Sequence, residues 1–215
     1  MKIIKIDYGS KLYPEQLYTI YNPPKILYAL GNVELLKTHM IAMVGTRIPT
    51  RYGSNCAITI AKELSNNGYT IVSGLAVGID QFSHEGALLG KSKATIAVLG
   101  NSVDINDLYP KENEYLYKKI LYENGLIISE YPLGIKAEKW HFPERNRIIS
   151  GLAEKLIVVE ASKHSGTSIT VECALDQGKD VYAVPGNIDS VKSEGCNQLI
   201  SQGAYIFTSI SDVIQ

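Results

Sequence analysis

Cations and aromatic rings gather in one short stretch, KWHFPERNRIISG, which runs from residue 139 to residue 151. The bases of a single-stranded nucleic acid stack on aromatic faces, at about 1–3 kcal/mol per base, while cations follow the phosphates. A plainer arrangement is equally open, in which the rings are core residues and the arginines form surface ion pairs. The side chains in question are Lys139, Trp140, Phe142, Arg145 and Arg147.

The overall charge of the chain does not explain this cluster. Of 215 residues, 21 are Lys or Arg and 22 are Asp or Glu, which gives a formal net charge of −1. A polyanion would therefore be held by a local patch and not by the field of the whole molecule. Hydrophobic residues make up 45% of the chain, which is ordinary for a globular domain with a sizeable core.

Cysteine usage and the N-terminal residues bear on the cellular compartment. The three cysteines, Cys56, Cys173 and Cys196, are widely spaced and form no C-x-x-C pair, which is typical of free thiols in a reducing environment. Lys5 and Asp7 interrupt the first apolar run, unlike a signal peptide, and no run approaches the roughly 20 apolar residues of a membrane helix. We expect a cytoplasmic protein without a membrane partner.

Strand-like and helix-like segments alternate from residue 40 onwards. Short apolar runs that end in glycine or polar residues predict buried parallel strands, and the segments between them carry one apolar face each. The alternation predicts an α/β fold: an extended Rossmann-like, doubly wound, mostly parallel sheet with helices on both faces. Residues 1–39 are expected to be a lead-in segment that packs on this main domain, 40–215. Ser54 and Asp80 are the expected caps of its first two helices.

The loops at the carboxyl ends of the strands are the candidate site, because ligands of such sheets bind there. The first strand ends in Gly45, Thr46 and Arg47, so an arginine stands where a G-x-G-x-x-G dinucleotide motif has its second glycine. Backbone N–H groups at the following helix start still favour an anion, and Arg47 adds a full positive charge. The alternative is an Arg47 that pairs with a carboxylate at the sheet edge.

Two further loops offer anion donors. Ser73 and Gly74 end the second strand and could present a hydroxyl and an N–H group to a phosphate. Ser165, Gly166 and Thr167 open a later helix and are typical of an anion-binding nest, although simple helix capping explains them equally well.

Hydrolytic and metal chemistry are not indicated. Ser73, Asp80 and His84 lie close in sequence, but a nucleophile elbow requires G-x-S-x-G, and Ile71 stands two positions before Ser73. The four histidines show neither H-E-x-x-H nor Cys/His ligand spacing. We therefore expect no catalytic residue and no metal site.

Seven motifs occur in order along nearly the whole chain, from about residue 13 to about residue 208. They read VGTR, SGLAVGID, VLG…YP, ISEYP, FPERNRIISGL, SGTSITVECAL and AVPGNI, the last followed by G-x-N-x-LI-x-x-GA. The set resembles the DprA/Smf family of bacterial DNA-processing proteins, and RNRIISGL after Phe-Pro is its most distinctive part.

The resemblance implies an extended Rossmann-like fold that binds single-stranded DNA as a homodimer, without sequence specificity, cofactor or catalytic activity. It also implies that the protein protects single strands and loads the RecA recombinase in homologous recombination or in DNA uptake (natural transformation). Carried over to this chain, the DNA pocket involves Gly45, Thr46, Arg47, Ser73, Gly74, Lys139, Phe142, Arg145, Arg147, Ser165, Gly166 and Thr167.

Within this set the individual roles differ. Phe142 is the expected stacking ring and Trp140 a weaker candidate. Arg147 lies further into the predicted helix than Arg145, so it is the better candidate for bracing the loop. An apolar dimer surface would come from residues 197–207, which suit an ordinary buried helix and strand equally well.

Three features depart from the family pattern. Many members carry an additional N-terminal helical domain or a C-terminal winged-helix domain, and at 215 residues we expect neither here. The glycine-rich turn that usually follows VLG reads NSVD, and the glycine-serine-leucine loop reads Gly166, Thr167, Ser168. These departures concern the rim of the pocket and not the fold.

A related class of enzymes and sensors is the alternative. The lysine-decarboxylase-like phosphoribohydrolases of the same superfamily share a PGGxGTxxE loop whose glutamate serves the glycosidic chemistry. The matching place here has Thr170 in the position of that glutamate, and Glu172 lies two residues on, roughly half a turn away on a helix of 3.6 residues per turn. This argues against the hydrolase, whereas a nucleotide-sensing module stays open.

Overall fold

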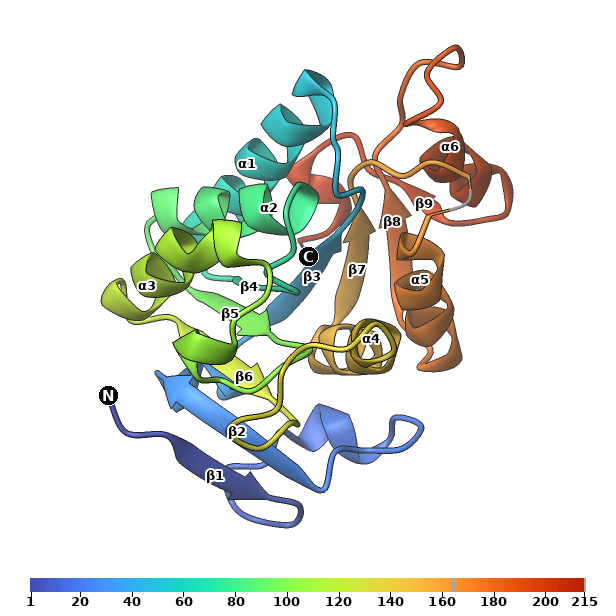
Figure 1. Cartoon of the computed structure of the whole chain (residues 1–215). Coiled ribbons are helices and arrows are strands. Elements are labelled where there is room, and N and C mark those ends of the chain that lie inside the picture. Colours follow the sequence, from blue (N-terminus) through green and yellow to red (C-terminus); the bar gives the residue numbers. More distant parts are fainter. Residues whose placement is uncertain (164, 215) are drawn as a thin grey trace.

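Short, mostly apolar runs form the strands of one sheet that crosses the whole molecule (Figure 1). The computed structural model describes residues 1–163 and 165–214, and within them the sheet order is β1-β2-β6-β5-β4-β3-β7-β8-β9. The strands are β1 (Ile4–Asp7), β2 (Ile26–Gly31), β3 (Met40–Val44), β4 (Thr70–Ser73), β5 (Thr95–Val98), β6 (Leu126–Ser129), β7 (Lys155–Val158), β8 (Asp180–Ala183) and β9 (Tyr205–Ile206).

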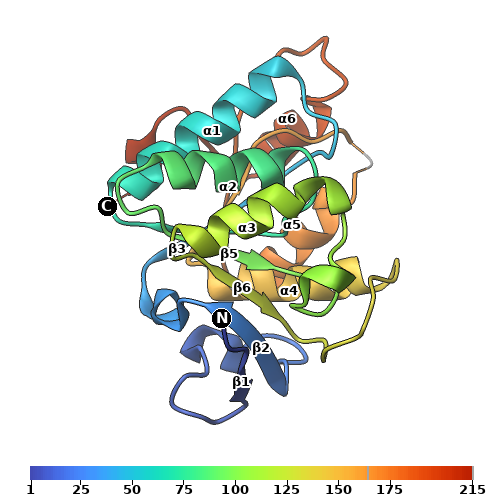
Figure 2. The ribbon, with the colours of Figure 1, turned by 60° about the vertical axis from the view of Figure 1, so that its left-hand side comes forward.

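Helices cover both faces of this sheet, which confirms the expected doubly wound α/β fold. On one face α1, α2 and α3 lie side by side (Figure 2), and α4, α5 and α6 pack on the other. Their bounds are α1 (Arg51–Asn66), α2 (Ile79–Leu89), α3 (Glu114–Tyr122), α4 (His141–Leu152), α5 (Thr167–Asp176) and α6 (Glu194–Ser201). In the described ranges, no helix is both long and apolar enough to cross a membrane.

The order of the parallel strands creates a natural ligand crevice. From β3 the chain moves outward through β4, β5 and β6, and from β7 it moves outward in the opposite direction through β8 and β9. All of these neighbouring pairs are parallel, and β3 and β7 lie next to each other. The loops after β3 and β7 therefore diverge at the point where doubly wound sheets bind ligands.

The first 39 residues add two strands to the sheet. β1 pairs antiparallel with β2, and β2 pairs antiparallel with β6. These two strands give the otherwise parallel sheet an antiparallel edge, a common arrangement in large sheets of this class.

The connection between β1 and β2 also packs against α4. A 3-10 helix, Glu15–Tyr18, buries Leu17, and Ile20 follows it into the same core. Gly151 in α4 makes room for both side chains, since a Cβ at this position would lie 2.9 Å from a methyl carbon of each. The N-terminal segment and α4 therefore hold each other in place.

Two helix starts differ from the sequence-based expectation. Thr50, and not Ser54, caps α1: its hydroxyl accepts a hydrogen bond from the N–H of Gly53 at 3.1 Å. Gly78, with a φ of 86°, precedes α2, so Asp80 lies inside the helix. The left-handed conformation of Gly78 places α2 close to the loop after β3, where a Cβ would meet Arg47 at 2.7 Å.

Substitution Leu17→Ala tests the attachment of the N-terminal segment to α4. Leu17 is fully buried, so we expect the free energy of unfolding to fall by about 2–5 kcal/mol. Urea denaturation measures this loss. Tyr21→Ala, in the same segment but exposed, is the control and should change stability by no more than about 0.5 kcal/mol. Equal effects of the two substitutions would contradict the packing role of Leu17.

Candidate functional site

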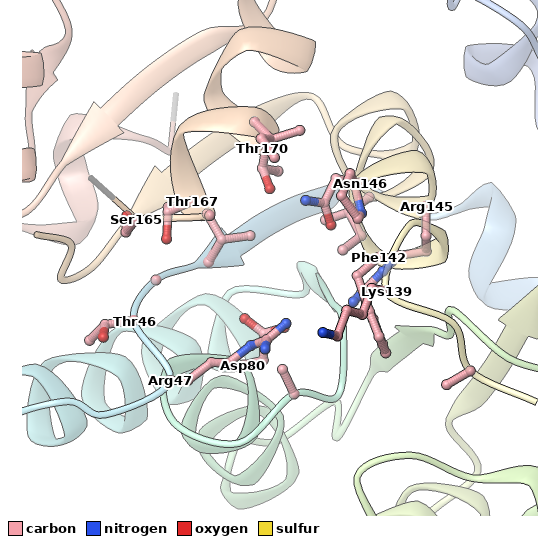
Figure 3. Close-up of a pocket in the computed structure, with 18 of the residues that line it drawn as sticks. Thr46, Arg47, Asp80, Lys139, Phe142, Arg145, Asn146, Ser165, Thr167 and Thr170 are labelled. Carbon is pink, nitrogen blue, oxygen red and sulfur yellow. The ribbon is translucent and has the colours of Figure 1, made fainter. Parts of the chain in front are cut away.

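A groove of about 790 Å³ lies at the carboxyl ends of the central strands (Figure 3). Its walls come from the loop after β3, the loop between β4 and α2, the segment leading into α4, and the start of α5. This is the switch point of the sheet. Of the residues expected at the site, the groove brings together Gly45, Thr46, Arg47, Lys139, Phe142, Arg145, Ser165, Gly166 and Thr167.

Two exposed cations face each other across the groove. The side chains of Arg47 and Lys139 extend toward one another from opposite walls (Figure 3). Within residues 1–163 and 165–214, neither cation forms an ion pair with a carboxylate. The alternative, in which Arg47 pairs with a carboxylate at the sheet edge, is therefore not seen among the described residues. Both charges are available to an anion.

An aromatic ring lines the same groove, beside Arg47. The Phe142 ring is half-buried, and the Arg47 guanidinium carbon lies 5.7 Å from its centroid. The Tyr109 ring packs against Phe142 with 5.7 Å between centroids. Gly100 permits this position because a Cβ there would lie 3.0 Å from the ring. The result is a supported aromatic surface in a groove with two exposed positive charges.

Arg145 forms part of the floor and is buried. Its Nη1 donates to the carbonyl oxygen of Val98 at 2.9 Å, and only a glycine at position 74 leaves room, because a Cβ there would lie 1.7 Å from Nη1. Burial lowers the pKa of Arg145 to about 10, and the nearby charge of Asp80 opposes that shift. The guanidinium stays charged at neutral pH and holds the ends of β4 and β5 to α4.

Asp80 completes this buried layer. It accepts a hydrogen bond from the N–H of Gly74 at 3.0 Å. Burial raises the pKa of the Asp80 carboxyl, while the Arg145 charge acts in the opposite direction. Asp80 therefore holds the β4–α2 loop against Arg145.

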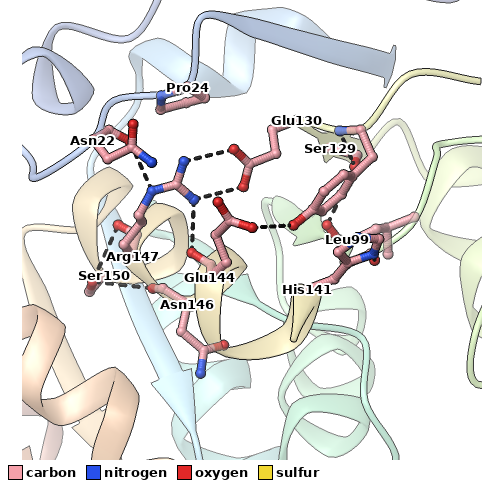
Figure 4. A network of polar contacts seen from close by, with 12 residues as sticks. Asn22, Pro24, Leu99, Ser129, Glu130, His141, Glu144, Asn146, Arg147 and Ser150 are labelled. Atoms are coloured by element: carbon pink, nitrogen blue, oxygen red, sulfur yellow. Dashed lines mark hydrogen bonds and ion pairs between the residues drawn. The ribbon is translucent and has the colours of Figure 1, made fainter. Parts of the chain in front are cut away.

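Arg147 was expected at the DNA pocket, but it does not line the groove. Its Nη1 and Nη2 donate to the two carboxylate oxygens of Glu130, each at 2.7 Å (Figure 4). Nη1 also donates to the carbonyl oxygen of Glu144 at 2.8 Å, and Nε donates to that of Asn22 at 2.9 Å. Arg147 thus ties α4 to β6 and to the N-terminal segment, which is the bracing role considered for it.

Ser73 and Gly74 were also expected at the DNA pocket, and neither lines the groove. The Ser73 hydroxyl is fully buried and donates to the carbonyl oxygen of Met43 at 2.6 Å. The Gly74 N–H is used by Asp80. Neither group faces the groove, because both faces of a central strand in this fold are covered.

His84 is buried beneath the groove and is neutral. Thr95 donates its only hydroxyl proton to the carbonyl oxygen of Ile71, so the 2.7 Å contact between Thr95 Oγ1 and Nδ1 of His84 requires an N–H on Nδ1. Nε2 has no hydrogen-bond partner among the described residues, and a proton there would have no acceptor. Burial and the charge of Arg145 lower the pKa of His84 to about 3. Ser73, Asp80 and His84 do not form a catalytic triad.

The start of α5 closes the groove on the side of β7. Gly166 immediately precedes the helix, Thr167 is buried, and Ser165 lines both the groove and a smaller neighbouring pocket. The N-terminus of a helix favours an anion, so this wall adds to the positive potential of the groove. Thr170 lines the groove, whereas Glu172 is exposed and does not line it.

Sequence reasoning missed several side chains that line the groove. Tyr109 supports Phe142. Asn146 of α4, next to Arg145 in sequence, also lines the groove (Figure 3). The Tyr-Pro pair after the strand motif VLG was the available signal for Tyr109. In the described part of the chain, no group of three or more His, Cys, Asp or Glu side chains could hold a metal ion.

A doubly wound α/β sheet whose switch point opens into a groove with accessible cations and a supported aromatic ring defines a Rossmann-like ligand-binding protein. The family model described as DNA recombination-mediator protein A matches residues 5–215, and the chain belongs to this family. The resemblance inferred from the seven motifs is confirmed.

Comparisons with individual proteins agree. DNA processing protein DprA of Bacillus subtilis is 43% identical over 98% of this chain and 70% of its own length. Protein Smf of Escherichia coli is 39% identical over 98% of this chain and 55% of its own length, so the chain spans about half of that relative.

Two solved structures share the fold. An X-ray structure of Streptococcus pneumoniae DprA has a TM-score of 0.90 and 41% identity, covering 99% of this chain and 73% of that one. A Helicobacter pylori DNA processing protein A, described for its mode of binding single-stranded DNA, has a TM-score of 0.88 and 32% identity, covering 98% of this chain and 93% of that one.

The neutral, buried His84 predicts that acid destabilises the fold. The pKa of His84 rises from about 3 in the folded chain to 6.5 in the unfolded chain, so the unfolded state binds an additional proton between these values. The free energy of unfolding should fall by about 1.4 kcal/mol per pH unit from this residue as the pH drops from 6 to 4. Urea denaturation of wild type and His84→Asn across this range should show a shallower dependence in the variant. Equal slopes would contradict a neutral His84.

Proposed function

We propose that this protein binds single-stranded DNA in the groove and acts as a recombination mediator. The observation that carries the proposal is the pair of accessible cations, Arg47 and Lys139, in a groove at the switch point of the sheet that the Phe142 ring also lines. Membership of the DNA recombination-mediator protein A family and similarity to a relative described as binding single-stranded DNA support it.

Each groove residue has a distinct role in this proposal. Arg47 and Lys139 neutralise phosphates, and the start of α5 with Ser165 and Thr167 offers further donors to the same backbone. Phe142 stacks on a base. Arg145 makes no direct contact with the DNA in this proposal. It is buried, it stabilises the floor of the groove, and its charge adds to the positive potential there.

The chemistry of the groove favours binding over catalysis. The position of the glutamate of the related phosphoribohydrolases is occupied by Thr170, which lines the groove and has no carboxylate. Glu172 is exposed and does not line the groove. A bound nucleotide would therefore meet no general acid or base from this part of α5.

The partners belong to the same proposal. A strand held by its phosphates and one or a few bases stays accessible along the rest of its length, so it can be protected and then presented to the RecA recombinase. We place this activity in the cytoplasm, in homologous recombination or in DNA uptake during natural transformation. The cysteines Cys56, Cys173 and Cys196 are free thiols, which suits that compartment.

A homodimer would form at the edge of the sheet that ends in β9. Tyr205 and Ile206 of this short strand are exposed, and β9 pairs with β8 on one side only. An exposed apolar strand edge is a surface on which a second copy can pair. This is part of the region, 197–207, in which the sequence suggested a dimer surface.

Substitution Arg47→Ala tests the groove as the DNA site. With a fluorescent oligo(dT) titrated at several salt concentrations, we expect the wild type to bind more weakly as salt rises. The variant should bind more weakly still, and the slope of log affinity against log salt should decrease by about 0.7, which corresponds to one phosphate contact.

The control for this titration is Phe142→Ala, which removes a ring and no charge. It should cost about 1–3 kcal/mol of binding and leave the salt slope unchanged. Lys118→Ala, on the exposed surface of α3, should change neither quantity. If the wild type does not bind oligo(dT) even at low salt, the proposed function is wrong.

Sedimentation velocity tests the dimer. The wild type should sediment as a dimer at micromolar concentration, and Ile206→Lys should sediment as a monomer because a charge on a strand edge opposes pairing. Leu89→Lys, at an exposed apolar position of α2, should remain a dimer. A monomeric wild type would exclude this edge as a stable interface.

A further inference from the structure

The only tryptophan of the chain stands just outside the groove. Lys139 lines the groove, whereas Trp140, the next residue, does not. Trp140 is 57% exposed, so at least one face of its indole ring is open to solvent. Exposure alone does not make a site, because single apolar side chains are common on protein surfaces. What distinguishes Trp140 is the way in which its ring is supported.

Two buried aromatic rings lie against the indole. The His141 ring is 4.0 Å from it between centroids, and the Tyr131 ring is 6.4 Å from it. These two rings stack on each other at 4.0 Å. Nδ1 of His141 lies 2.9 Å from the carbonyl oxygen of Gly100, and the Tyr131 hydroxyl donates to Glu144 at 2.9 Å. The indole therefore rests on a pair of rings that the fold itself holds in place.

The indole also has a hydrogen bond of its own. Its Nε1 donates to Oε2 of Glu138 at 2.7 Å, which restricts rotation of the ring and satisfies its one donor. The more exposed Tyr21 and Tyr122 pack on no other aromatic ring in the described part of the chain. A ring that is held in place before binding loses little conformational entropy when a flat group stacks on it.

Positive charge accompanies the ring along the same segment. Residues 136–140 contain two lysines and one glutamate, so the net charge of this segment is positive. Lys136 and Lys139 are both exposed, and within residues 1–163 and 165–214 neither forms an ion pair with a carboxylate. A supported aromatic ring beside exposed cations is the combination that binds single-stranded nucleic acid.

We propose that Trp140 is a second stacking site for the bound strand, an inference that rests on the proposed function. One base stacks on Phe142 in the groove. The strand then crosses the rim formed by residues 137–139, and a further base stacks on the open face of Trp140. The sequence made Trp140 the weaker candidate for a single stacking position, whereas in this proposal the two rings serve different nucleotides.

The spacing of the two rings suits neighbouring nucleotides. Trp140 and Phe142 are two residues apart, so their Cα atoms are separated by at most about 7.6 Å. This separation is comparable to the length of a single nucleotide in an extended strand. Every base has a π-face, so stacking tolerates any sequence. The second site therefore lengthens the contact with the strand without giving it a base preference.

The fluorescence of Trp140 tests the proposal directly, because the chain has no other tryptophan. The wild type is titrated with 20-mers of oligo(dT) and oligo(dA), and anisotropy shows when binding is saturated. We expect both strands to lower the emission roughly twofold and to shield the ring from acrylamide, a soluble quencher. Unchanged emission at saturation would overturn the second site while leaving the proposed function intact. No binding to either strand would overturn both.

A strand without bases separates stacking from the mere presence of DNA. A 20-mer of abasic sites keeps the phosphates and sugars, so at saturation it should leave the emission unchanged. Equal quenching by abasic and normal strands would contradict stacking. A chain with both Trp140→Phe and Tyr122→Trp carries its only indole on the exposed side of α3, and oligo(dT) should not quench it. Quenching there as strong as in the wild type would also overturn the proposal.

Affinity gives a second, independent measure. Trp140→Ala should weaken the binding of oligo(dT) roughly tenfold, which is within the range that one stacked base contributes, and leave the salt slope unchanged because no charge is removed. Trp140→Phe keeps a ring and should recover most of this loss. Wild-type affinity in a folded Trp140→Ala would contradict the proposal. The fluorescence titration uses the unaltered chain, so it decides the question even if this variant is unstable.

Discussion

The buried charge of Arg145 is the constraint on which the site depends. A guanidinium placed beneath the ends of parallel strands must keep hydrogen bonds and a nearby negative charge, or its burial becomes too costly. The carbonyl oxygen of Val98 accepts from Nη1, the carboxylate of Asp80 supplies the nearby negative charge, and Gly74 gives the side chain its space, whereas Nε has no hydrogen-bond partner among the described residues. The neutral state of His84 belongs to the same arrangement, because a second positive charge below Arg145 would be unfavourable.

One side of helix α4 lines the groove, and the opposite side packs against the rest of the fold. Residues two apart on an α-helix point about 200° away from each other. Arg145 therefore faces the groove, and Arg147 faces β6 and the N-terminal segment, where it pairs with Glu130. Phe142 is one turn before Arg145 and shares its side. The motif that looked like one basic cluster is a helix with a ligand face and a scaffold face.

Much of this structure was predictable from the sequence, and the reasons are local. Apolar runs ending in glycine located the central strands, and strand-end loops located Arg47 and the start of α5. Individual roles were less accessible, because they depend on which side of an element is covered. Ser73 looked like a phosphate donor, yet its hydroxyl serves Met43 on the neighbouring strand. The Tyr-Pro pair marked Tyr109, but its role could not be assigned, since the Phe142 ring that it supports comes from a distant part of the chain.

A chain of net charge −1 can hold a polyanion because some of its cations are neutralised in ion pairs with carboxylates, while others remain exposed and, in the part of the chain that the structure describes, unpaired at the groove. Arg147 is neutralised by Glu130, and several surface lysines pair with nearby acids. Arg47 and Lys139 form no ion pair among the described residues. Of the two carboxylates that line the groove, Asp80 is buried beside Arg145, and Glu138 accepts a hydrogen bond from Nε1 of Trp140. Positive potential therefore concentrates where the strands end. The Phe142 ring in the same groove adds base stacking, an attraction that salt does not screen. Binding would therefore combine phosphate contacts that weaken as salt rises with a stacking contact that does not.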